Sequence, residues 1–129
     1  MIKTNITEMF GITKPIFSAP MGPFYTKDLA LAVSESGGLG TLSNVNLIGK
    51  DPIKETIEGI RYLTEHTDKP FGYNILVARG SEAVKKFCVE VPQFILENTK
   101  AKEQCLYHLS SAGSSKVLPS TQSFKMSFF

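Results

Sequence analysis

With 129 residues, 42% of them hydrophobic, the chain suits one domain with a core of ordinary size. A net charge of +2, with basic residues scattered among acidic ones, predicts neither a nucleic-acid partner nor a charged membrane partner. No apolar run approaches the roughly 20 residues of a membrane-spanning helix, and the amino terminus lacks a signal-peptide core, so we expect a cytoplasmic protein.

The first core element is an apolar run over residues 15–19. It is too short for a helix, and the turn-forming residues Pro20 and Gly22 follow it at once. This pattern predicts a short buried strand whose carboxyl end opens into a loop.

A helix is expected to begin near Thr26, which is a suitable N-cap. Its predicted apolar stripe comprises Leu29, Ala32 and Val33. Residues 37–38, both glycine, supply a helix stop, and a second strand is predicted over residues 39–43.

The clearest helical pattern begins with Asp51 as N-cap and Pro52 at the first helical position. Apolar residues follow at spacings of four, three and three, which places them on one helix face. They are Ile53, Ile57, Ile60 and Leu63. We expect this face to pack on the sheet.

A third strand is predicted over residues 71–77, in which Asn74 is the one polar side chain within an apolar run. A third helix is expected from Ser81, with Cys88 in the core, until Pro92 breaks it. Cys88 and Cys105 are expected to stay unpaired in a reducing compartment, and without CxxC spacing they form no metal site.

Beyond this helix, a separate helical piece is predicted within residues 93–103, with Phe94, Ile95 and Leu96 buried. A fourth strand is expected over residues 105–109. After residue 118 the pattern is lost, and we expect an irregular tail over residues 119–129.

Short apolar strands that alternate with helices predict an α/β fold of about four βα units, with a parallel sheet and right-handed crossovers. The strands begin near residues 15, 39, 71 and 105. Such units form either a small open sheet or one half of an eightfold barrel.

Four motifs, in this order, resemble the nitronate monooxygenase family: PIFSAPMG, SGGLGTLS, KPFGYNILV and LSSAGSSKVLP. Members of this family are FMN-dependent (β/α)8-barrel flavoproteins, close in pattern to the flavin-dependent enoyl-ACP reductases. The resemblance covers roughly residues 5 to 118. It implies a partial TIM-barrel, the N-terminal half of an FMN-dependent domain, over residues 1–118.

The resemblance implies FMN as cofactor, bound at the carboxyl ends of the strands. In the family a Pro-Met-Gly segment lies along the flavin and an asparagine contacts it; the matching residues are Pro20, Met21, Gly22 and Asn74. Ser111, after the fourth strand, is expected on the same face. From the residues alone, Met21 also suits plain core packing, and Asn74 suits a cap on a neighbouring loop.

No catalytic residue is assigned. The family's general base is a histidine in a glycine-rich loop well downstream, and neither His66 nor His108 lies in such a motif. His66 suits a solvated helix end, and His108 suits a strand. The phosphate-binding loops follow strands seven and eight of such barrels, and nothing here matches them.

The resemblance implies an oxidoreductase that uses dioxygen to convert a small alkyl nitronate into a carbonyl compound and nitrite. A relative of the enoyl-ACP reductases is a second interpretation. A third is a non-catalytic half-barrel or interaction protein, which folds as a homo-oligomer or with the missing barrel half, because open sheet edges need partners. A separate nucleotide-binding fold is disfavoured, because neither GxGxxG nor GxxxxGK[ST] occurs.

Overall fold

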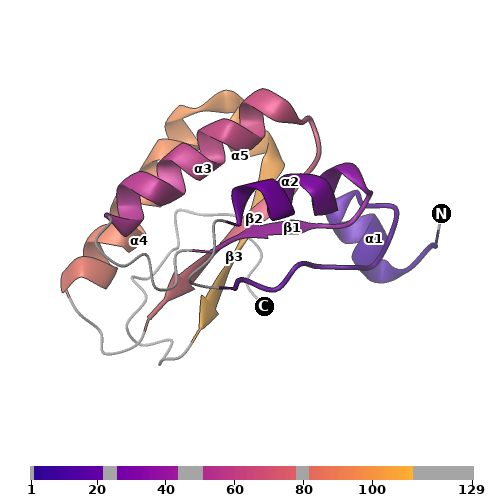
Figure 1. The fold of residues 1–129 in the computed structure, drawn as a ribbon, viewed down its shortest axis with the longest axis horizontal. Coiled ribbons are helices and arrows are strands. Elements are labelled where there is room, and N and C mark those ends of the chain that lie inside the picture. The colour runs from indigo at the N-terminus through magenta and orange to yellow at the C-terminus, as the bar shows by residue number, and fades with distance from the viewer. Residues whose placement is uncertain (1, 22–25, 44–50, 78–81, 112–129) are drawn as a thin grey trace.

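The computed structural model describes residues 2–21, 26–43, 51–77 and 82–111 (Figure 1). Within these ranges three parallel strands form one sheet in the order β1-β2-β3, which confirms the α/β class and the sequential parallel order. The elements are α1 (Asn5–Phe10), α2 (Lys27–Glu35), β1 (Gly40–Leu42), α3 (Pro52–His66), β2 (Phe71–Leu76), α4 (Glu82–Glu97), α5 (Thr99–Gln104) and β3 (Cys105–Ser111). The predicted tail over residues 119–129 lies outside the described residues.

The predicted strand over residues 15–19 is reduced to one parallel bridge, between Phe17 and Leu39. The Ser18 N–H donates to the Leu39 carbonyl at 3.0 Å. The Thr41 N–H then donates to the Ser18 side chain, at 2.8 Å from Oγ. A side chain thus takes the next position in the ladder, and no described main-chain bridge follows Ser18. The prediction of a buried strand was wrong, since the segment is an exposed edge.

The sheet packs on both faces. On one face, a large core lies between the strands and the helices α2 to α5, which Figure 1 shows on the same side of the sheet. Its strand residues are Leu42, Phe71, Tyr73, Ile75 and Cys105. Since side chains alternate along a strand, Gly72 and Asn74 of β2 face the opposite side. We call that side the inner face; a smaller core there joins Phe10 and Ile12 to Leu39 and Tyr107.

Helix α3 forms as predicted. The Asp51 carboxylate accepts hydrogen bonds from the main-chain N–H groups of Ile53 and Lys54 at 2.9 and 3.4 Å, which satisfies donors at the helix start. Ile60 and Leu63 are fully buried on the sheet, whereas Ile53 and Ile57 are only partly buried beside them.

Helix α2 turns a different face to the sheet than predicted. None of the predicted stripe is buried, namely Leu29, Ala32 and Val33; Ala30 and Ser34 are buried instead. A Cβ atom at Gly40 would lie 2.1 Å from the Ala30 carbonyl oxygen, so strand and helix backbones touch. Only small residues fit where the two backbones are this close. The Ser34 hydroxyl therefore lies near the strand, where it accepts from the Gly40 N–H at 3.1 Å and donates to the Pro70 carbonyl at 2.8 Å.

Helix α2 begins as predicted, with Thr26 at the N-cap position. The Thr26 side chain does not bond the helix start; its hydroxyl accepts from the Ser43 N–H at 2.9 Å and so ties α2 to β1. One prediction about a helix end is corrected. Pro92 lies inside α4 and does not end it. Proline has no N–H for the Cys88 carbonyl, but Pro92 and Ile95 are buried, and this packing outweighs the lost bond. Phe94 and Leu96 were predicted to be buried with Ile95. Phe94 is only partly buried, and Leu96 is exposed.

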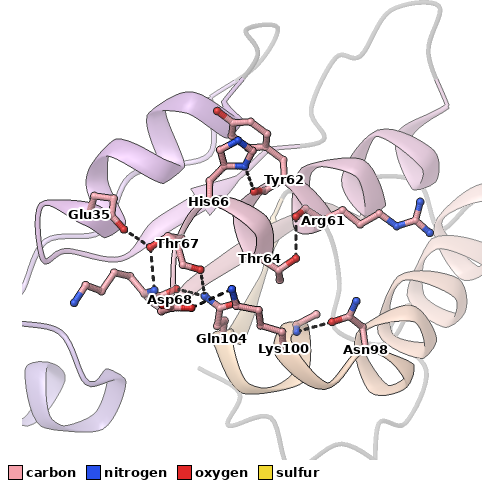
Figure 2. Close-up of polar contacts among 12 residues, drawn as sticks. Glu35, Arg61, Tyr62, Thr64, His66, Thr67, Asp68, Asn98, Lys100 and Gln104 are labelled. Atoms are coloured by element: carbon pink, nitrogen blue, oxygen red, sulfur yellow. Dashed lines mark hydrogen bonds and ion pairs between the residues drawn. The ribbon is translucent and has the colours of Figure 1, made fainter.

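Gln104 ties α5 to the loop before β2 (Figure 2). Its buried side-chain amide donates to the carbonyls of Thr67 and Lys69 at 2.7 and 3.1 Å. The nearby ion pair between Lys100 and Asp68, at 3.0 Å, joins the same segments but is solvent-exposed and therefore contributes little. The amide of Gln104 is thus the stronger of these two links.

Replacing Ile60 by alanine is expected to lower the free energy of unfolding by about 2–5 kcal/mol, because it empties a fully buried core position. Chemical denaturation measures the loss. Leu29→Ala, at an exposed position on α2, is the matched control and should change stability by less than about 1 kcal/mol. Equal losses in both variants would contradict the packing described for α3.

Replacing Gln104 by leucine keeps the side-chain volume but leaves the carbonyls of Thr67 and Lys69 without this donor. We expect a loss of about 1–3 kcal/mol in the same denaturation experiment. Gln93→Leu is the control, because Gln93 is exposed and its side chain bonds Glu97 of the same helix, at 3.0 Å. A Gln104 variant as stable as the Gln93 variant would rule out the amide as a link.

Candidate functional site

The inner face contains one row of three facing residues, one from each strand. Thr41 pairs with Gly72, and Gly72 pairs with Tyr107. The Tyr107 ring lies over Gly72, where a Cβ atom would come within 2.1 Å of a ring carbon. The ring thereby crosses β2, and its hydroxyl hydrogen-bonds the Thr41 hydroxyl. Burial raises the pKa of Tyr107, so this hydroxyl stays neutral.

This arrangement depends on one extra residue in β3. Phe71 pairs with Cys105, yet the next residue, Gly72, pairs with Tyr107, so Leu106 has no partner in the ladder. In an unbroken register Tyr107 would point toward the helices, because side chains alternate between the two faces. The register shift therefore places alternate residues of β3, from Tyr107 onward, on the inner face.

Asn74 lies two residues beyond Gly72 and is fully buried. Its amide nitrogen donates to the Leu109 carbonyl at 2.8 Å and to the Ser111 hydroxyl at 3.0 Å. Both amide hydrogens are thus engaged, and the side-chain oxygen Oδ1 has no hydrogen-bond partner within the described part of the chain. A buried oxygen without a donor is costly, and it suits the N–H group of a bound molecule.

The structure joins two of the five predicted site residues. Asn74 and Ser111 are in direct contact on the inner face, near the carboxyl ends of β2 and β3. Pro20 and Met21 lie where the edge segment leaves β1, and no described hydrogen bond connects them to Asn74. The Met21 side chain is 49% exposed, which argues against plain core packing. Gly22 lies outside the described residues.

Sequence reasoning missed Tyr107 and Thr41 as inner-face residues. One signal was present: Gly72 interrupts an apolar strand, and glycine there marks a close approach by another group. That signal does not identify the approaching group. To identify Tyr107, the register shift at Leu106 would have had to be known, and no local sequence pattern predicts that shift.

The histidines and cysteines lie away from the inner face. His66 is exposed at the end of α3, with Nδ1 2.7 Å from the Tyr62 carbonyl, as predicted for a helix end. His108 lies in β3 on the helix side, where burial lowers its pKa. Cys88 and Cys105 are buried and unpaired, and burial raises the pKa of both thiols, so neither is an activated nucleophile. Among the described residues no cluster of three or more metal-ligating side chains occurs.

Comparison with known proteins identifies related sequences. A family model described as nitronate monooxygenase matches residues 3–115. The nitronate monooxygenase of Paraburkholderia phytofirmans is 40% identical over 81 residues, which cover 63% of this chain and 21% of that protein. That of Pseudomonas aeruginosa is 38% identical over 79 residues, with 61% and 21% covered. An octahydro-indene-carboxyl-CoA dehydrogenase of Mycobacterium tuberculosis is 31% identical over 124 residues, with 92% and 33% covered.

Among solved structures, FabK from Thermotoga maritima superposes with a TM-score of 0.60 at 27% sequence identity. The match covers 91% of this chain and 40% of that chain. The present chain therefore spans about a fifth to a third of these curated relatives and two fifths of this structure. In the described part of the chain, no helix has the length and apolar character to cross a membrane.

Replacing Gly72 by alanine should displace the Tyr107 ring and cost about 1–3 kcal/mol, the range for overpacking a tight site. The control is a double-mutant cycle with Tyr107→Ala, which removes the ring. In that background Gly72→Ala should cost less than about 0.5 kcal/mol. The same cost in both backgrounds would show that the ring does not occupy this space.

Proposed function

Because this chain belongs to the nitronate monooxygenase family, we propose that it forms part of an FMN-dependent oxidoreductase that acts on a small alkyl nitronate. The flavin ring would lie at the carboxyl ends of the strands, along Pro20, Met21 and Gly22. Asn74 and Ser111 would hold one edge of the ring. The carboxyl ends of parallel strands are where (β/α)8 barrels bind their ligands.

The observation that carries this proposal is the buried Oδ1 atom of Asn74. Both amide hydrogens of Asn74 are already used, so this side chain can only accept a hydrogen bond from a ligand. The pyrimidine part of the flavin ring carries an N–H donor that matches it. The Ser111 hydroxyl fixes the amide in this orientation and thereby positions the acceptor.

Tyr107 has a separate role beneath this acceptor. Its ring covers Gly72, one inner-face position before Asn74, and its hydroxyl is held by Thr41. A ring in this place prevents a planar ligand from sinking between the strands. Tyr107 would thus set the depth at which the flavin lies.

FMN, when bound, supplies the electron acceptor and the reaction with dioxygen that together convert a nitronate into a carbonyl compound and nitrite. The described residues of this chain bind and orient; none is assigned a proton transfer. His66 and His108 both lie away from the inner face, so the general base of the intact family stays unassigned here. The cytoplasmic location also stays a prediction.

Two alternatives have support of their own. The likeness to FabK, over 91% of the chain, favours a relative of the flavin-dependent enoyl-ACP reductases as the second candidate. The exposed sheet edge at residues 15–19 favours a half-barrel that is inactive alone. General base catalysis contributes about 10²–10⁴-fold, so a chain without its base should turn over slowly even with flavin present.

We expect the 129-residue chain to bind FMN weakly and to show little oxygen uptake with a small alkyl nitronate. Flavin fluorescence measures the binding, and an oxygen electrode measures the turnover. Ser111→Ala should weaken FMN binding about five-fold, equivalent to about 1 kcal/mol, because the Asn74 amide loses one anchor. Ser110→Ala, the neighbouring hydroxyl on the other strand face, is the matched control.

Equal FMN affinity in the two serine variants would contradict the placement of the ring beside Ser111. An absence of any FMN binding would refute the flavin site itself. Retention of FMN through gel filtration together with rapid oxygen uptake would show that the chain is active without further residues.

A further inference from the structure

Both edges of the sheet are open within the described part of the chain. Phe17 forms a parallel bridge with Leu39, just before β1, and no described strand lies on its other side. β3 pairs only with β2. An open edge carries unpaired N–H and C=O groups, and these are satisfied by another strand rather than by an apolar ligand.

Large apolar side chains are exposed at both edges. Phe17, on the inner face of the first edge, and Leu109, on the inner face of β3, are each 40% exposed. Ile16, on the outer face of the first edge, is 58% exposed. It lines a groove of about 250 Å³ with Ala32 and Val33 of α2. An exposed apolar groove beside an unpaired edge suits a protein–protein interface.

The two edges are complementary to each other. All strand pairs are parallel and follow chain order, so the first edge of one copy can accept β3 of a second copy in the same direction. A two-fold rotation makes the two resulting contacts equivalent and closes the assembly. Each copy would contribute the segment at residues 15–18 and three strands, which together give the strand number of a (β/α)8 barrel.

We propose that two copies of this chain associate edge to edge, with β3 of each copy paired in parallel with residues 15–18 of the other. The two inner faces then enclose one shared lumen, and Phe17 and Leu109 become buried. This association does not require flavin, so it stands or falls separately from the proposed function.

The test measures the molar mass of the flavin-free chain by light scattering and sedimentation. We expect twice the mass of one chain. Ile16→Lys and Leu109→Glu each place a charge on one edge and should give folded monomers. Their matched controls are Val89→Lys on α4, at 57% exposure, and Leu29→Glu on α2, at 40% exposure; both should remain dimers.

A mixture of the two edge variants provides the sharpest result. In a mixed pair one contact joins two unaltered edges, whereas each variant alone has both contacts altered. Dimer should therefore reappear on mixing Ile16→Lys with Leu109→Glu. Failure of the mixture to form dimer, while the controls do, would overturn the edge-to-edge arrangement.

Other outcomes also decide the proposal. A folded wild-type monomer at all concentrations would overturn it, as would open assemblies larger than two chains or a dimer that both edge variants retain. Hydrogen exchange of the unaltered chain guards against variants that fail to fold. The Phe17 amide and the β3 amides that do not bond β2 should lose protection on dilution, and protection independent of concentration would overturn the proposal.

Discussion

The contact between the Tyr107 ring and Gly72 is the constraint on which the inner face depends. It requires the glycine in β2, the extra residue Leu106 in β3 and the hydroxyl of Thr41 in β1 at the same time. The extra residue sets which residues of β3 lie beside Asn74, while Gly72 leaves room for the ring and Thr41 bonds its hydroxyl. The site is therefore defined by register before it is defined by side-chain chemistry.

A second close approach fixes the other side of the sheet. Gly40 allows the backbones of β1 and α2 to touch, and Ser34 then links both to the loop before β2. The two glycines leave space on opposite faces of the sheet. Gly40 leaves room for the backbone of α2 on the helix side, and Gly72 leaves room for the Tyr107 ring on the inner face. Together these close contacts fix how α2 packs on one face of the sheet and how the Tyr107 ring packs on the other.

Much of this fold could be predicted from the sequence, because the signals were local. Asp51 and Pro52 begin α3, and the apolar run of β2 is bounded by turn residues. The buried face of α2 could not be predicted, since small residues were selected there by contact with Gly40, and hydrophobicity alone favours Leu29. The prediction that Pro92 ends a helix failed for the same reason. Burial of Pro92 depends on residues distant in sequence, and it outweighed the tendency of proline to end helices.

Gln104 of α5 bonds the loop at the start of β2, and Asn74 lies near the end of that strand; both are buried amides that bond main-chain carbonyls. The first holds the chain where the strand begins, and the second presents its oxygen near the strand's end. Changes that alter stability and changes that alter ligand chemistry can thus accumulate at separate ends of one strand. Substitutions around Asn74 are therefore expected to leave the Gln104 anchor at the other end of the strand in place.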